Sequence, residues 1–212
     1  MHEPLVTLAF LAAHTDRLLL GASALITPLR EPILLAKQAA TLDALAPRRA
    51  LLGVGAGWER SEFDALGVQF TGRATRTDDI IDTVRGLHAT GRGPGGGIFA
   101  PIPAPPAPIV VVGASSPALH RAARFGDVWQ AVGRTSDQFI TDRQRLRSLT
   151  PRAVAAGARI AWPAEHGLPA LLAEIERWRP VEPDHLAIWV GELLTAGERI
   201  AALGTVLKQT PT

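Results

Sequence analysis

Apolar and polar positions along the chain fall into blocks that predict strands and helices in turn. Residues 18–26 and 51–55 are nearly continuous apolar runs, which is the pattern of strands buried on both faces of a parallel sheet. Between them, residues 33–45 repeat apolar positions at helical spacing, and a shorter helix is expected over residues 3–13. A helix between two buried strands predicts a right-handed crossover, so the two strands should lie parallel.

The same alternation continues towards the C-terminus. Further helices are expected over residues 78–88, 117–125, 143–149, 168–178 and 196–208, and further strands over residues 108–113, 128–132, 159–162 and 185–190. Residues 91–108 are rich in glycine and proline, so they form either a loop within one fold or a linker between domains. We favour the loop, because strands and helices go on alternating after it.

Six strands that alternate with helices predict a parallel sheet covered by helices. An open doubly wound sheet and a barrel both satisfy this order. A complete (β/α)8 barrel takes roughly 250 residues, so six units in a shorter chain leave about two units unaccounted for. The expectation is a single α/β domain over residues 1–212 of the (β/α)8 TIM-barrel type, incomplete, with strands three to eight present and the first two βα units missing.

Composition narrows the classes of function. The net charge is only +2 and no long basic run occurs, so nucleic acid is not expected as a partner. The chain has no cysteine, and its 6 histidines lack the spacing of zinc ligands, so no metal site is expected. No apolar run reaches the roughly 20 residues of a membrane span and no signal-peptide pattern is present, which favours a cytoplasmic protein without a membrane partner.

A short loop of small residues follows the expected strand at 108–113. In parallel α/β folds the ligand meets the carboxyl ends of the strands, so this loop is a candidate site. Its residues precede a helix, where backbone amides, serine hydroxyls and the helix dipole suit a phosphate. The same residues also suit a plain helix N-cap. The residues concerned are Gly113, Ala114, Ser115 and Ser116.

A second loop at the same end of the expected sheet contains Gly55, Gly57 and Trp58. Its glycines lack the third glycine of the dinucleotide fingerprint at the required spacing, so they are expected to make room for a flat ring or for close packing. Trp58 suits either stacking on a ligand or packing at the barrel rim. Asp78 and Asp79 fall at an expected helix start, where capping is favoured over catalysis.

Several stretches taken together resemble the bacterial luciferase-like family. They are residues 20–32, 36–43, 52–58, 62–63, 76–79, 112–115, 118–119, 122–124, 126–129 and 184–187. The resemblance covers most of the chain and is weakest over residues 135–158. It implies that the ring of coenzyme F420 or of a flavin lies across the barrel mouth.

The resemblance also implies particular cofactor contacts. A non-proline cis peptide in a bulge of the third strand supports the ring, and it would fall at Ser23 and Ala24. The cofactor phosphate would lie near residues 113–116. The cofactor-binding residues expected on this basis are Ser23, Ala24, Gly55, Gly57, Gly113, Ala114, Ser115 and Ser116. Where the family commonly has paired glycines, this chain has Val112 and Gly113, which weakens the expected phosphate contact.

The first function hypothesis is an oxidoreductase that transfers hydride between F420 and a small organic substrate. The alternative is an FMN-dependent monooxygenase, and a further class is a non-catalytic flavin-binding or inactive remnant. The family usually takes its acid and base residues from the first two strands, so no catalytic residue is assigned. The strand edges left open by six strands favour a homodimer, or an interaction domain that closes its barrel with another chain.

Overall fold

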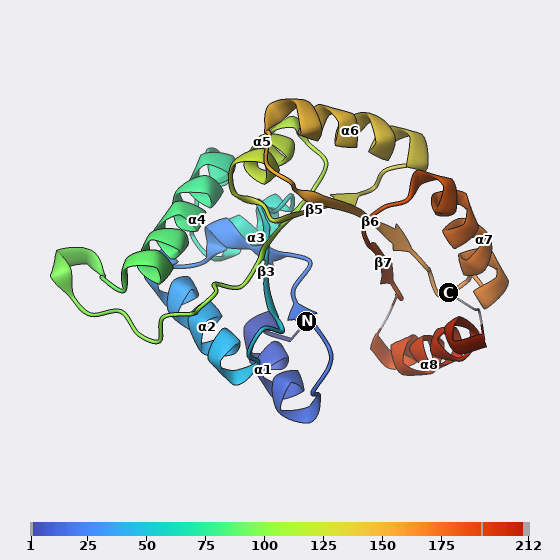
Figure 1. The fold of residues 1–212 in the computed structure, drawn as a ribbon, viewed down its shortest axis with the longest axis horizontal. Coiled ribbons are helices and arrows are strands. Elements are labelled where there is room, and N and C mark those ends of the chain that lie inside the picture. Colours follow the sequence, from blue (N-terminus) through green and yellow to red (C-terminus); the bar gives the residue numbers. More distant parts are fainter. Residues whose placement is uncertain (1, 192, 210–212) are drawn as a thin grey trace.

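The computed structural model describes residues 2–191 and 193–209. In these residues one parallel sheet curls into half of a barrel and carries helices on its convex side (Figure 1). The strands are β1 Leu20–Gly21, β2 Leu25–Ile26, β3 Ala50–Gly55, β4 Ile109–Val112, β5 Val128–Val132, β6 Ala155–Ala161 and β7 Leu186–Trp189. The sheet order is β1-β3-β4-β5-β6-β7, with β2 also paired to β3.

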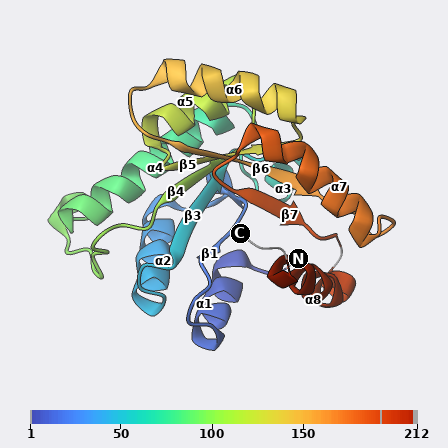
Figure 2. The ribbon, with the colours of Figure 1, turned by 45° about the vertical axis from the view of Figure 1, so that its right-hand side comes forward.

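Seven of the eight described α-helices correspond to helices that the sequence predicts, and the short helix α3 was not predicted. The eight helices are α1 Pro4–His14, α2 Pro32–Leu45, α3 Arg60–Ala65, α4 Arg73–Thr90, α5 Ser116–Phe125, α6 Ser136–Leu149, α7 Leu168–Trp178 and α8 Leu193–Gln209. Figure 2 shows α1 and α8 at the two ends of the curved sheet. The predicted barrel-type α/β fold is therefore confirmed as a half-barrel. None of the described helices combines the length and apolar character needed to cross a membrane.

The expected strand over residues 18–26 is interrupted. It forms β1 and β2, each parallel to β3, which confirms the predicted parallel pairing. Leu20 pairs with Ala50 and Leu25 with Val54, so five steps along one strand match four steps along β3. One extra residue is therefore accommodated as a bulge between β1 and β2. The peptide between Ser23 and Ala24 in this bulge is cis, as the family resemblance implies.

Helices α4, α6 and α8 begin at Arg73, Ser136 and Leu193, earlier than the sequence predicts, and strand β6 begins at Ala155 instead of residue 159. Helix α6 carries the apolar residue Phe139 before its predicted start, so its early start was a missed signal. The first turn of α4 is largely polar, so apolar periodicity does not detect it. Asp78 consequently lies in the second turn of α4, and the capping role expected for Asp78 and its neighbour is wrong.

Side chains of the central strands alternate between two environments. In β3 to β6 the convex face packs on the helices, as where Trp129 stacks on Phe139 of α6 with ring centroids 5.4 Å apart. The next residue of β5, Gln130, has its amide in the concave face of the sheet. Residues 91–108 connect α4 to β4, and β4 pairs in parallel with β3, so the sheet continues across this glycine- and proline-rich segment.

Candidate functional site

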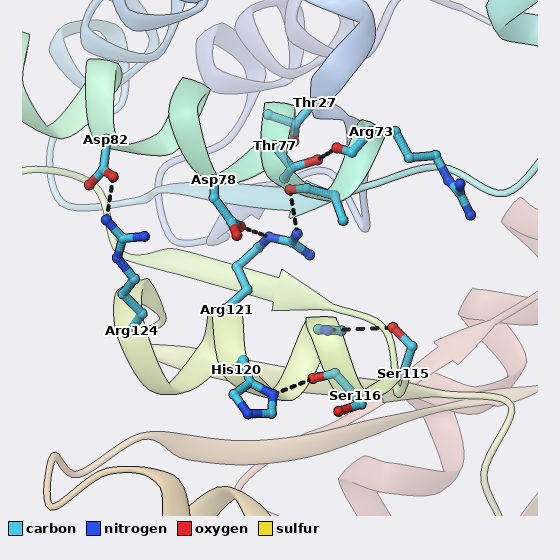
Figure 3. Close-up of polar contacts among 12 residues, drawn as sticks. Thr27, Arg73, Thr77, Asp78, Asp82, Ser115, Ser116, His120, Arg121 and Arg124 are labelled. Atoms are coloured by element: carbon cyan, nitrogen blue, oxygen red, sulfur yellow. Dashed lines mark hydrogen bonds and ion pairs between the residues drawn. The ribbon is translucent and has the colours of Figure 1, made fainter. Parts of the chain in front are cut away.

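The segment from Gly113 to Ser116 joins the carboxyl end of β4 to the first turn of α5, as predicted. Ser115 is the N-cap, because its Oγ accepts a hydrogen bond of 3.4 Å from the amide of Ala118 (Figure 3). Gly113 has a φ of +131°, a conformation in which glycine is favoured. Since the Ser115 hydroxyl accepts from the backbone, its own proton remains able to donate to a ligand oxygen. The N-cap and anion-site interpretations are therefore compatible.

Two arginine side chains stabilise this segment from outside. Arg145 of α6 donates through Nη2 to Ser116 Oγ at 2.8 Å, and Arg134 donates through Nη2 to the carbonyl oxygen of Ala114 at 2.7 Å. Arg145 adds positive potential near the N-terminus of α5, where the helix dipole already favours an anion, whereas the charge of Arg134 is paired with Asp142. Neither arginine is predicted from the sequence, because nothing near them in the chain indicates where α6 lies relative to α5.

A chain of polar contacts crosses the concave face of the sheet and ends at Ser23. Gln130 Nε2 donates to Ser23 Oγ at 2.6 Å, and His185 Nε2 lies 3.3 Å from Gln130 Oε1. Arg159 of β6 donates through Nη1 to the Ser23 carbonyl oxygen at 2.9 Å. Ser23 is thus held by both its hydroxyl and its carbonyl. The sequence analysis did not find the roles of Gln130, Arg159 and His185, although a glutamine within the apolar strand β5 was a detectable signal.

The glycines expected to bind cofactor have packing roles in this structure. A Cβ on Gly55 would lie 3.1 Å from the Cβ of Ala24. A Cβ on Gly57, whose φ is +73°, would lie 2.7 Å from the side chain of Ile26. Close packing against the bulged strand therefore explains both glycines, and their contact with a cofactor stays a prediction. Trp58 is 82% exposed, so packing at the rim is wrong for it.

A cavity of 720 Å³ opens at the carboxyl ends of β5, β6 and β7. Its walls combine aromatic side chains, including Trp162 and Trp189, with the charged groups Arg134, Arg159, Arg177 and Glu174. The volume lies within the range of small-molecule sites. Arg134 is paired with Asp142, and Arg177 with Glu174. Among the described residues, Arg159 has no acidic partner, so it contributes an uncompensated positive charge to the cavity.

His185, at the end of this polar chain, is half-buried over Gly157. A Cβ on Gly157 would come within 2.2 Å of the imidazole ring, so only glycine leaves room for the ring there. Burial lowers the pKa of His185 from its ordinary value of 6.5, and the charge of neighbouring Asp184 partly offsets that shift. Because Gln130 Oε1 can only accept, the neutral ring donates from Nε2.

The lowered pKa of His185 predicts a loss of stability at acidic pH. The folded state binds fewer protons at this ring than the unfolded state, so the free energy of unfolding should fall as pH drops below about 6.5. His185→Gln should flatten this dependence in urea unfolding measured from about pH 8 to pH 5.5. His2→Gln, at an exposed position, controls for the loss of one histidine. Equal slopes for His185→Gln and the wild type would contradict the assignment.

These features define the class of fold. A parallel half-barrel with an anion-suited loop and a cavity at the carboxyl ends of its strands is of the barrel type, in which ligand sites lie at these strand ends. The family model described as luciferase-like monooxygenase matches residues 1–172. The chain belongs to this family, which confirms the resemblance found in the sequence.

Curated relatives include both uncharacterised and named proteins. An uncharacterised protein of Mycobacterium tuberculosis is 38% identical over 156 residues, which cover 68% of this chain and 54% of the relative. An F420-dependent glucose-6-phosphate dehydrogenase of Kineococcus radiotolerans is 42% identical over 87 residues, covering 40% of this chain and 26% of that enzyme. The chain therefore spans about half the length, or less, of these relatives.

Solved structures share the fold at low sequence identity. An F420-dependent secondary alcohol dehydrogenase in complex with an F420-acetone adduct superposes with a TM-score of 0.75 at 14% identity, covering 88% of this chain and 78% of that chain. The oxygenating constituent of 3,6-diketocamphane monooxygenase from Pseudomonas putida, in complex with FMN, gives 0.64 at 16% identity, covering 82% and 57%. The relatives and structural neighbours of the chain thus include F420-dependent enzymes and a monooxygenase in complex with FMN.

Proposed function

We propose that the chain is the cofactor-binding part of an oxidoreductase that transfers hydride between F420 and a small organic substrate. The observation that carries this proposal is the segment from Gly113 to Ser116, where two serine hydroxyls, a helix N-terminus and two arginines converge. The 42% identity with an F420-dependent dehydrogenase supports F420 as the cofactor.

The residues present fit such a cofactor. Ser115 and Ser116 each accept a hydrogen bond within the protein, so both hydroxyls keep a proton with which to bind a phosphate oxygen. Gly55 packs closely against Ala24, the residue after Ser23, so the residues around the proposed position of the ring are small. The hydrogen-bond donors at the N-terminus of α5 suit an anion, and the concave face of the sheet beside them suits the flat ring of the cofactor.

The chain's own residues would bind and orient the reacting groups. When bound, F420 supplies the carbon centre that accepts or releases a hydride. Ser115 and Ser116 hold its phosphate, and Gln130 and Arg159 fix Ser23 beneath the ring. The cavity next to Arg159 receives the organic substrate, and its tryptophan side chains limit the access of water. No catalytic acid or base is assigned among these residues.

The proposal is tested by titrating the purified chain separately with F420 and with FMN, following fluorescence. We expect F420 to bind at least about tenfold more tightly, a difference of about 1.4 kcal/mol. Tighter binding of FMN would favour the alternative, an FMN-dependent monooxygenase. The chain shares its fold with the FMN complex of such a monooxygenase described above. Absence of binding for both cofactors would leave a non-catalytic protein as the better interpretation.

A matched pair of substitutions at Ser115 tests the phosphate site. Aspartate and asparagine both cap helices about as well as serine, so both variants should keep α5 intact. The carboxylate of Ser115→Asp should repel the cofactor phosphate and weaken F420 binding by about tenfold or more. Ser115→Asn should bind F420 within about twofold of the wild type, since it adds no charge. Equal affinities of the two variants would contradict a phosphate at this position.

The homodimer stays a prediction. Strands β1 and β7 are the ends of the sheet within the described residues, and each presents one edge that pairs with no other described strand. Such edges favour pairing with a second chain. Sedimentation of the purified chain at several concentrations measures its oligomeric state. The cytoplasmic location likewise stays a prediction.

A further inference from the structure

Arg159 lies between Ser23 and the cavity at the carboxyl ends of β5, β6 and β7. Its Nη1 donates to the carbonyl oxygen of Ser23, 136 residues away in the sequence, and its side chain also lines the 720 Å³ cavity. This arginine therefore lies beside the peptide on which the cofactor ring is proposed to rest. A guanidinium group remains charged at every pH at which the protein is folded.

Within the part of the chain that the structure describes, no acidic side chain pairs with Arg159. The other charged groups that line the cavity are Arg134, Arg177 and Glu174, with His166 as a further titratable group. Arg134 is paired with Asp142 at 2.7 Å, and Arg177 is paired with Glu174. A positive charge that lacks an acidic partner among the described residues, in a partly enclosed and aromatic-lined cavity, favours a negatively charged ligand group.

We propose that Arg159 binds the anionic form of the cofactor ring and lowers the proton affinity of that ring. The inference rests on the proposed function, because it requires F420 to bind over Ser23. The hydroxyl group of the deazaflavin ring is conjugated with the pyrimidine carbonyl, so loss of its proton gives an anion spread over the whole ring. A guanidinium at either end of that conjugated system stabilises the anion relative to the neutral ring.

Two features of Arg159 support a role towards the ring rather than in packing alone. The side chain donates a hydrogen bond to a backbone carbonyl, which satisfies one donor but neutralises no charge. Ser23 is also held from its hydroxyl side by Gln130, at 2.6 Å, so the position of this residue does not depend on Arg159 alone. The contribution that no other described residue duplicates at Ser23 is therefore the positive charge.

The experiment is a pH titration of oxidised F420 bound to the intact chain, followed by the long-wavelength absorption band of the anionic ring. Bound to the wild type, the ring should stay anionic to a lower pH than free F420 does. In Arg159→Gln the midpoint should rise by about one pH unit, which is a tenfold gain in the proton affinity of the ring. Arg159→Lys should restore most of the wild-type midpoint, because it keeps the charge.

The double variant Glu174→Gln with Arg177→Gln is the matched control. It removes both members of an ion pair that lines the same cavity, so it leaves the net charge of the cavity and the midpoint of the bound ring unchanged. Every other titratable group is common to the wild type and Arg159→Gln, so their difference isolates the effect of Arg159. Circular dichroism of each variant establishes that the fold is kept.

The outcomes separate this inference from the proposed function. If the wild type binds F420 and Arg159→Gln titrates with the wild-type midpoint, the role of Arg159 is overturned while cofactor binding stands. If Arg159→Gln no longer binds F420, recovery of binding in Arg159→Lys supports the role of the charge, and loss of binding in both folded variants overturns it. A wild-type chain that does not bind F420 overturns both proposals.

Discussion

Gly53→Ala is expected to prevent the chain from folding. A Cβ on Gly53 would lie 1.7 Å from the carbonyl oxygen of Ala22 and 2.9 Å from its carbonyl carbon. Both are backbone atoms of the bulge between β1 and β2, so no side-chain rotation can relieve the overlap. The cost should exceed about 4 kcal/mol, a large part of the stability of a typical domain. Soluble yield and circular dichroism measure the loss.

Gly86→Ala provides the control for that substitution. Gly86 lies on the exposed side of α4, and a Cβ there would meet no atom within 4 Å. Alanine favours the helix over glycine, so this variant should be more stable than the wild type by up to about 1 kcal/mol. Opposite effects of the same glycine-to-alanine change are expected from the two positions. A folded Gly53→Ala variant with wild-type stability would refute the bulge geometry.

Asp78→Ala is expected to cost about 3 kcal/mol of unfolding free energy, because it leaves a buried cation unpaired. The side chain of Arg121, on α5, is only 2% exposed and pairs with Asp78 of α4 (Figure 3). Arg121 Nη2 also donates to the carbonyl oxygen of Ala74 at 2.8 Å. Without the carboxylate, the guanidinium keeps this single neutral partner. Urea unfolding of the variant and the wild type measures the difference.

Asp82→Ala is the matched control on the same helix. Asp82 pairs with Arg124 of α5, one turn along, but the two side chains are 50% and 62% exposed. An exposed ion pair contributes less than about 1 kcal/mol, so this variant should unfold close to the wild type. Both substitutions place alanine in α4 and change helix propensity alike. Equal costs for Asp78→Ala and Asp82→Ala would show that burial of Arg121 does not matter.

The elements of the fold were predicted from local sequence patterns, whereas the contacts between distant residues required the tertiary structure. The order and type of the elements follow from local patterns, because apolar spacing and caps involve residues within one or two turns of each other. Strand β5 and helix α7 have the predicted bounds, and Ser115 acts as the N-cap that its position before a helix suggests. The early start of α4 was missed, since its first turn carries no apolar face, whereas in α6 the apolar Phe139 was overlooked.

In the candidate site, too, the features that depend on neighbouring residues were predicted, and those that depend on distant residues were not. The segment from Gly113 to Ser116 was found from sequence, because small residues between a buried strand and a helix are a local signal. Its arginine partners were not found, since Arg145 approaches Ser116 only when α6 packs beside α5. Asp78 was misinterpreted for the same reason: its partner Arg121 lies 43 residues away.

By itself, the sequence determined the alternation of strands and helices, the parallel pairing and the loop suited to an anion, because each depends on residues close together in the chain. Only the tertiary structure decided which side chains meet on the concave face. Ser23 meets Gln130 and Arg159 across separations of 107 and 136 residues. That meeting depends on the curvature of the whole sheet, which no short stretch of residues encodes, whereas the family resemblance already implied the bulge after β1.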